Sequence, residues 1–274
     1  MIKMSNVRQK GVYLIPNLFT TGNLFSGFYA IISIFNAEYL MAAYAILAAT
    51  VFDSLDGKAA RFAHATSRFG TEYDSLADLV SFGLAPGLLI YSWALHSYTY
   101  NRLGWIAAFL FLACGALRLA RFNVQSAVAD ARFFTGLPIP AAASAVALTV
   151  ILDSHILRMG REIKPVLMLV MTYGLAFLMV SSIRYRSFKH INFSFKKPFQ
   201  YLVSAILILV VIVLEPQIML FSLVMLYALS GPVEKPVWAL LALFGKKKEE
   251  VVEQDHDDID DLDEDEGVPT HRYP

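Results

Sequence analysis

Four aspartates at helical spacing are the side chains of this sequence with the clearest chemical potential. Two lie in the segment DSLDGKAAR (residues 53–61), and two lie in GTEYDSLAD (residues 70–78), after a gap of eight residues. Long apolar stretches flank both segments. Charged side chains at membrane depth are costly and usually functional. We therefore expect the four carboxylates to form a site.

Helical periodicity predicts how these residues face one another. On one helix, the positions i, i+3, i+4, i+7 and i+8 share a stripe, which here is Asp53, Asp56, Gly57, Ala60 and Arg61. A second helix would carry Gly70, Asp74 and Asp78 on its own stripe. Two such helices, facing each other, would bring four carboxylates together beside a surface that bears few side chains.

Four neighbouring carboxylates repel one another unless a cation lies among them. Carboxylate oxygens suit hard divalent ions such as Mg²⁺ or Mn²⁺. The pattern therefore predicts a metal site inside a membrane protein. Polar residues that merely hold two helices together are the structural alternative, and buried unpaired charge is poorly suited to that purpose.

The composition of the chain indicates the elements that must position these aspartates. Its 274 residues are 57% hydrophobic, and the mean hydropathy is +0.52. Such values predict an all-α polytopic membrane protein. Apolar runs suggest about eight spans, of which the second and third carry the aspartates and the fifth and eighth are short for a bilayer: 17–35, 39–61, 68–94, 103–121, 138–153, 164–183, 200–214 and 217–230.

The distribution of basic residues predicts the orientation of the spans. The loops and ends on the side of the two termini hold 17 Lys and Arg, whereas the opposite side holds 4. Because basic residues favour the cytoplasmic side, the metal site is expected at the cytoplasmic ends of spans 2 and 3. This predicts an integral protein of the inner (cytoplasmic) membrane, surrounded by membrane lipids, with its active site facing the cytoplasm.

The C-terminal segment differs from the rest of the chain. Residues 245–274 hold 12 of the 23 Asp and Glu but 4 of the 23 Lys and Arg, which leaves 19 basic and 11 acidic residues elsewhere. Such a block of like charge predicts a disordered cytoplasmic tail. We therefore expect a transmembrane domain over 1–244 and a charged tail over 245–274. The single cysteine, Cys114, excludes an intrachain disulfide and suggests packing.

The full spacing of the two segments is D-x2-D-G-x2-A-R-x8-G-x3-D-x3-D, which resembles without a departure the signature of the CDP-alcohol phosphotransferases. Members of that family are integral membrane enzymes that exchange CMP for an alcohol on a lipid phosphate. The resemblance implies two divalent ions, Mg²⁺ or Mn²⁺, held by the four motif aspartates, with the last of them, Asp78, as general base for the alcohol. It also implies a homodimer, and nothing indicates a nucleic-acid partner.

Several further residues are expected to bind the CDP-lipid. Gly57 and Ala60 would leave a helix face open for the nucleotide, and Arg61 has a fork of donors suited to a diphosphate. The family also uses a hydroxyl just before the second segment, here Ser67. The remaining candidates are Gly70 and, at the start of the first span, Asn17 and Thr20. Helix packing for the glycines, topology for Arg61 and helix capping for Asn17 or Thr20 are the structural alternatives.

The flanking motifs resemble the phosphatidylserine synthase branch of the family. They are PNLFTTGNLFSG (16–27), DLVSFGLAP (78–86), RLARFN (118–123) and FTGLPIP (134–140). This branch transfers the phosphatidyl group of CDP-diacylglycerol to L-serine and releases CMP. A zwitterionic acceptor needs a cation for its carboxylate. We expect one of two arginines on a shared helix face, with an asparagine nearby, to bind serine or a lipid phosphate: Arg118, Arg121 and Asn123. The alternative for these arginines is contact with lipid headgroups.

Other functions remain open at the level of sequence. The same chemistry could use glycerol 3-phosphate or an inositol phosphate as acceptor, or an archaeal-type lipid as donor. A cation transporter could also use intramembrane aspartates. The aspartates, however, gather near one helix end without an acidic relay across other spans. A noncatalytic scaffold is disfavoured because every motif carboxylate is present.

Overall fold

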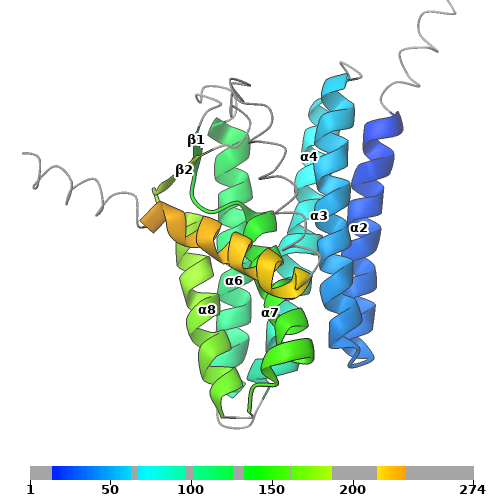
Figure 1. The fold of residues 1–274 in the computed structure, drawn as a ribbon. Coiled ribbons are helices and arrows are strands. Elements are labelled where there is room, and N and C mark those ends of the chain that lie inside the picture. Colours follow the sequence, from blue (N-terminus) through cyan, green and yellow to red (C-terminus); the bar gives the residue numbers. More distant parts are fainter. Residues whose placement is uncertain are drawn as a thin grey trace, which may run out of the picture. The chain divides into compact units, whose positions relative to one another are not determined.

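The computed structural model describes residues 14–62, 67–96, 101–125, 133–160, 162–186 and 215–232. The chain divides into two compact units, Met1–Leu229 and Ser230–Pro274. In the described residues of the first unit, the regular elements are helices apart from one short ribbon (Figure 1). In the described ranges, six helices are long and apolar enough to cross a membrane. The prediction of an all-α polytopic membrane protein is thereby confirmed.

The helices follow the predicted spans closely. α2 (Leu14–Phe35) and α3 (Tyr39–Phe62) come first, followed by a long span that consists of α4 (Arg68–Asp78), the π-helical turn η1 (Leu79–Leu84), α5 (Ala85–Ile90) and η2 (Tyr91–Leu95). α6 (Asn101–Gln125), α7 (Ile139–Leu152) with η3 (Asp153–Leu157), and α8 (Ile163–Val180) complete the six. A shorter apolar helix covers Pro216–Pro232.

The count of eight spans stays a prediction. The seventh predicted span, 200–214, lies outside the described residues, as does the predicted tail at 245–274. The eighth corresponds to the shorter helix Pro216–Pro232. The fifth span, which is short in sequence, is lengthened by η3 to Ile139–Leu157 and is the most deeply buried of the six. Its neighbours therefore shield it from lipid.

Local sequence explains where several elements begin. The Ser67 hydroxyl accepts a hydrogen bond from the Gly70 N–H at 3.0 Å and caps the start of α4. Pro86 in the first turn of α5 has no N–H to donate, and the π-helical turn η1 lies directly before it. Pro140, in the first turn of α7, is tolerated there for the same reason.

Two three-residue strands form the ribbon, which the helical prediction did not include. β1 (Phe133–Thr135) pairs antiparallel with β2 (Arg184–Arg186). Gly136 then turns the chain with a φ of 81°, and its N–H donates to the Ile183 carbonyl at 2.8 Å. The next residue, Leu137, donates to the carbonyl of Leu178 at 3.0 Å. These bonds tie the start of α7 to the end of α8.

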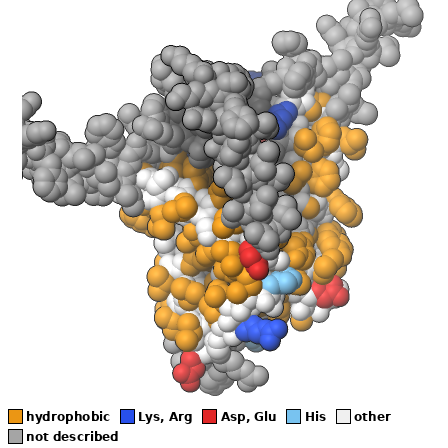
Figure 2. Space-filling model, in the orientation of Figure 1, with side chains coloured by type: hydrophobic (Ala, Val, Ile, Leu, Met, Phe, Trp, Pro, Cys, Tyr) orange, Lys and Arg blue, Asp and Glu red, His pale blue; other side chains and the backbone are white. Residues whose placement is uncertain are grey.

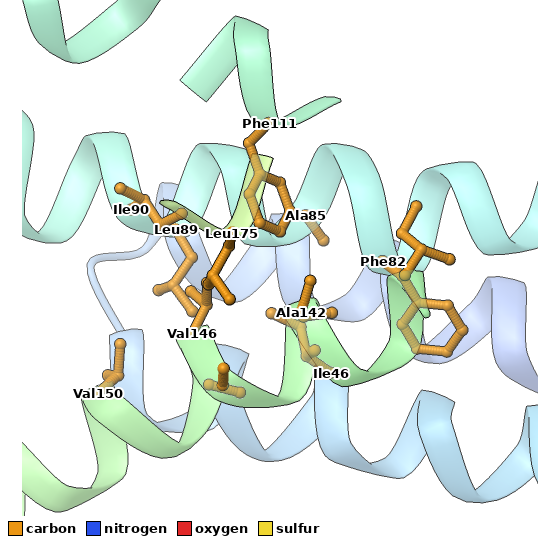
Figure 3. Close-up of a cluster of buried hydrophobic side chains, with 14 of the residues drawn as sticks. Ile46, Phe82, Ala85, Leu89, Ile90, Phe111, Ala142, Val146, Val150 and Leu175 are labelled. Atoms are coloured by element: carbon orange, nitrogen blue, oxygen red, sulfur yellow. The ribbon is translucent and has the colours of Figure 1, made fainter. Parts of the chain in front are cut away.

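The core lies where α7 meets α3 and the long α4–α5 span. Figure 3 shows Ile46, Phe82, Leu89 and Val146 pointing into one cluster, and each of these side chains is fully buried. Small residues on α3 and α7 allow this close approach: Ala42, Ala43, Ala45, Ala49, Ala142, Ala143, Ala145 and Ala147.

The outer surface of the helices is apolar as well. Hydrophobic side chains cover most of the described surface visible in Figure 2. On α2 alone, Leu18, Phe25 and Phe35 are more than two-thirds exposed, at 68%, 69% and 78%. Contact between such a surface and water is unfavourable, whereas lipid chains would cover it. The six helices therefore belong to an integral membrane protein.

Candidate active site

Three of the four motif aspartates converge between α3 and α4. One carboxylate oxygen from each of Asp53, Asp56 and Asp74 lies within 4.8 Å of the others. The Oδ1 atom of Asp74 is buried, and it has no hydrogen-bond partner among the described residues. Three carboxylates this close repel one another, and a divalent cation would remove that repulsion. The donor set therefore fits the hard cation that the sequence predicts.

Asp78 lies one helical turn beyond Asp74 and is outside this group of three. Its side chain is 8% exposed and lines the same pocket. The Oδ1 atom of Asp78 accepts a hydrogen bond of 2.9 Å from Nδ2 of Asn23 on α2. Its role as a fourth metal ligand stays a prediction, whereas its place beside the acidic cluster agrees with that of a base.

A pocket of about 440 Å³ opens over the aspartates. This volume falls within the usual range for small-molecule sites. Its walls come from α3, α4, α6 and the start of α7: Asp53, Ser54, Asp56, Gly57, Lys58, Thr71, Asp74, Ser75, Asp78, Arg118, Leu119, Phe122, Asn123, Pro138 and Pro140.

Helix α2 supports the site through hydrogen bonds. The hydroxyl of Thr20, which is buried, lies 3.2 Å from Oδ2 of Asp56 and 3.2 Å from the Pro16 carbonyl. On the next residue, the Thr21 hydroxyl lies 3.0 Å from that of Tyr73 on α4. Since α2 packs against both α3 and α4, its polar side chains connect the two helices that carry the aspartates.

The predicted nucleotide-binding residues other than Thr20 fall into three groups. Gly57 lines the pocket. Ser67 caps α4 through Gly70, and a Cβ atom on Gly70 would lie 3.5 Å from Oδ1 of Asn17, so these three residues adjoin one another. Ala60 and Arg61 belong to α3, but their side chains lie outside the described part of the chain.

The structure separates the two candidate arginines. Arg118 is 8% exposed and lines the pocket, where it interacts electrostatically with Asp78 and Asp53. Its Nε atom is buried without a hydrogen-bond partner in the described ranges. Arg121 does not line the pocket, and its Nη1 atom donates to the carbonyl of Val180 at 2.9 Å. Arg118 is therefore the better placed of the two to meet a ligand.

Asn123 also lines the pocket, as the sequence predicts. Its Nδ2 atom donates to the hydroxyl of Ser75, which follows Asp74 on α4, at 3.0 Å. The bond links α6 to the helix that carries Asp74 and Asp78. Asn123 therefore serves to hold the pocket wall in place, whatever ligand it meets.

Sequence reasoning missed Asn23, Ser75 and the pair Pro138 and Pro140. Asn23 follows Thr20 by three residues and so shares its helical stripe, which is a signal that could have found it. Ser75 adjoins a motif aspartate. The two prolines reach the pocket only because the ribbon and the turn at Gly136 place the start of α7 there, and no local pattern predicts that.

Comparison with known proteins agrees with this site. The model of the CDP-alcohol phosphatidyltransferase family matches residues 13–180, which include all four aspartates and both pocket prolines. A CDP-diacylglycerol–serine O-phosphatidyltransferase of Helicobacter pylori is 42% identical over 187 residues, which are 68% of this chain and 77% of the relative.

Two further relatives come from other organisms. The enzyme of the same name from Bacillus subtilis is 37% identical over 175 residues, which are 64% of this chain and 91% of the relative. The one from Methanocaldococcus jannaschii is 41% identical over 133 residues, which are 48% of this chain and 58% of the relative.

Proposed function

The chain belongs to the CDP-alcohol phosphatidyltransferase family, and on this premise we propose that it transfers a phosphatidyl group from CDP-diacylglycerol to L-serine. The products are phosphatidylserine and CMP. The observation that carries the proposal is one pocket that combines the acidic cluster, Asp78 and the buried Arg118. Its relatives named for this same reaction support the choice of serine.

Asp53, Asp56 and Asp74 would hold a divalent cation, with Asp78 as the predicted fourth ligand. We propose Mg²⁺ or Mn²⁺, and two ions on the family resemblance. Such ions, when bound, neutralise the charge of the diphosphate and polarise the phosphate that is attacked. The unpartnered Oδ1 atom of Asp74 agrees with a cation at this place.

Asp78 is the proposed general base. The serine hydroxyl oxygen forms a bond to the phosphorus of the phosphatidyl group, the bond from that phosphorus to the CMP oxygen breaks, and the hydroxyl proton passes to Asp78. Since Asn23 donates to Oδ1, we assign the proton to the other carboxylate oxygen, Oδ2. We expect direct in-line transfer without a covalent enzyme intermediate.

Arg118 is the proposed partner of the serine carboxylate. A guanidinium pairs with a carboxylate through two parallel hydrogen bonds, and this contact is stronger in a buried pocket than in water. Arg118 is buried, lines the pocket and has an unpartnered Nε atom, whereas Arg121 is bound to a backbone carbonyl. The same guanidinium could instead meet a lipid phosphate, or the phosphate of a different acceptor.

The CDP-lipid is assigned to the remaining part of the site. Gly57 gives the nucleotide access to the backbone of α3, together with Ala60, and Arg61 would bind the diphosphate. Asn17, Ser67 and Gly70 adjoin one another at the start of α4 and complete this set. Thr20 acts through Asp56, to which its hydroxyl lies close enough to donate.

The site is proposed to face the cytoplasm from the inner membrane. The basic residues gather on the motif side of the spans, and that asymmetry predicts the cytoplasmic side. A homodimer in membrane lipid is carried over from the family resemblance alone. A transmembrane domain over 1–244 with a charged tail over 245–274 completes the proposal.

Release of CMP by the purified full-length protein tests the proposal. The assay supplies CDP-diacylglycerol and Mn²⁺ or Mg²⁺, and compares L-serine with glycerol 3-phosphate and an inositol phosphate. We expect serine-dependent release that EDTA abolishes and that Asp78→Asn lowers by about 10²–10⁴-fold. Release with another acceptor would agree with phosphatidyl transfer from CDP-diacylglycerol but contradict serine as the acceptor. No release with any acceptor would favour a cation transporter.

A further inference from the structure

The carboxylate of Asp78 is held by a residue from a different helix. Asn23 on α2 is completely buried, and its Nδ2 atom donates to Oδ1 of Asp78 at 2.9 Å. The Oδ1 atom of Asn23 has no partner among the described residues. An unpaired buried carbonyl is unfavourable, and it would be more so if it faced the carboxylate. The amide is therefore oriented as a donor to the carboxyl group of Asp78.

A second hydrogen bond fixes the backbone that carries Asn23. The hydroxyl of Ser81, in the π-helical turn η1 that follows Asp78, donates to the backbone carbonyl of Asn23 at 2.9 Å. Next to this contact the helices nearly touch, because a Cβ atom on Gly27 would lie 2.7 Å from the Cα atom of Ser81. The donor and the carboxylate thus lie on two backbones that are locked in register.

We propose that Asn23 is a positioning residue for the phosphatidyl transfer: it fixes the carboxylate of Asp78 so that Oδ2 points to the attacking hydroxyl. The inference rests on the proposed function, in which Asp78 is the base. A carboxylate without this bond could rotate, and a misdirected base lowers the rate of the chemical step. Neither the binding of the lipid nor that of the acceptor should change, since Asn23 does not line the pocket.

Substitutions at Asn23 test this role in the CMP-release assay. Asn23→Leu preserves the approximate volume of the side chain and removes the hydrogen-bond donor. Asn23→Ala removes the donor and most of the side-chain volume. We expect kcat to fall by about 10–100-fold in each, as is typical when the partner that orients a functional group is lost. KM for CDP-diacylglycerol and for the acceptor should stay within about threefold. Ser33→Ala is the matched control, because Ser33 is a buried polar residue on α2 without a partner among the described residues.

A double variant separates positioning from a structural effect. If Asn23 acts through Asp78, then Asn23→Leu combined with Asp78→Asn should be no slower than Asp78→Asn alone. The melting temperature of Asn23→Leu should match that of the wild type. Losses that add in the double variant, or a kcat equal to that of Ser33→Ala, would overturn the inference.

The assay also distinguishes failure of the inference from failure of the proposed function. If the wild type releases CMP only with a different acceptor, serine is wrong, and the same variants are compared with that acceptor. If the wild type releases no CMP with any acceptor, both the function and the role of Asn23 are wrong.

Discussion

Two ends of the molecule each bury aspartate, and they compensate its charge in different ways. Asp153, at the far end of α7 from the pocket prolines, is 4% exposed and lies 2.8 Å from the Lys164 ammonium. Its other oxygen accepts the N–H of Met159, and Lys164 also lies over the ring of Trp93 at 4.4 Å. The buried charge of Asp153 is therefore compensated within the chain.

At the pocket end, the described side chains supply less positive than negative charge. Three carboxylates lie within 4.8 Å of one another, and the Oδ1 atom of Asp74 has no partner in the described ranges. Arg118 interacts with Asp53 and Asp78, and among the described residues only Lys58 joins it as a basic side chain in the pocket wall, against four aspartates. Buried charge without compensation is strongly destabilising. The comparison indicates that a structural aspartate is paired internally, whereas a functional cluster is completed by a ligand.

Loss of a cluster aspartate should have the largest effect on activity. We expect Asp74→Asn to lower CMP release by at least about 100-fold. Loss of a residue that merely orients a metal ligand typically costs ~10–100-fold, and a ligand itself should matter no less. Asp153→Asn is the matched control and should stay within about threefold of the wild type. Equal losses in the two variants would remove the distinction between the two ends.

Variants of Arg118 and Arg121 test which of these two arginines binds the acceptor at the pocket end. Loss of a hydrogen-bonded charge pair costs about 1.5–3 kcal/mol, so Arg118→Ala should raise KM for serine by roughly 10–100-fold. Arg121→Ala should leave that KM unchanged, since Arg121 binds the Val180 carbonyl. Steady-state kinetics at saturating CDP-diacylglycerol measure the KM for serine of both variants. Unchanged KM values for serine and for the lipid in Arg118→Ala would refute its assignment.

At the opposite end, the expected effect is on stability. Asp153→Ala removes the ion pair with Lys164 and the acceptor for Met159, and it should destabilise the fold by about 1–3 kcal/mol. The partial exposure of Lys164 reduces the contribution of the ion pair itself. Thermal unfolding in detergent measures the change. A loss of turnover in a variant with an unchanged melting temperature would contradict a structural role.

The smallest effect is expected at the ribbon. The Tyr185 hydroxyl donates to the Ala228 carbonyl at 2.9 Å, and burial, followed by the nearby Tyr227, raises the pKa of Tyr185 to about 12. It therefore remains a donor throughout the pH range of an activity assay. Tyr185→Phe should lower the stability by about 1 kcal/mol and leave kcat and KM unchanged. Thermal unfolding and CMP release on the same preparation check both.

Local periodicity predicted much of this architecture. The apolar runs predicted the six long helices that the structure describes, and the spacing of Asp53, Asp56 and Asp74 on two helical stripes predicted their convergence. Membership of the family is confirmed as well. These features depend on the helical repeat and on composition, both of which can be read from neighbouring residues.

Helical periodicity and composition did not predict the side-chain contacts between helices. The stripe that carries Asp74 also carries Asp78, yet the structure directs the Asp78 carboxylate to Asn23 rather than into the group of three. The different contacts of Arg118 and Arg121 likewise depend on which neighbour each side chain meets. Side-chain rotamers and the register between helices determine these contacts, and a single sequence carries no direct record of either.

Binding of Mn²⁺ tests most directly whether a cation completes the acidic cluster. Electron paramagnetic resonance of free Mn²⁺, titrated with detergent-purified protein, gives the affinity without any need for turnover. We predict saturable binding by the wild type, similar binding by Asp153→Asn, and affinity at least about tenfold weaker in Asp74→Asn. Equal binding by Asp74→Asn and the wild type, or no saturable binding by the wild type, would contradict the account.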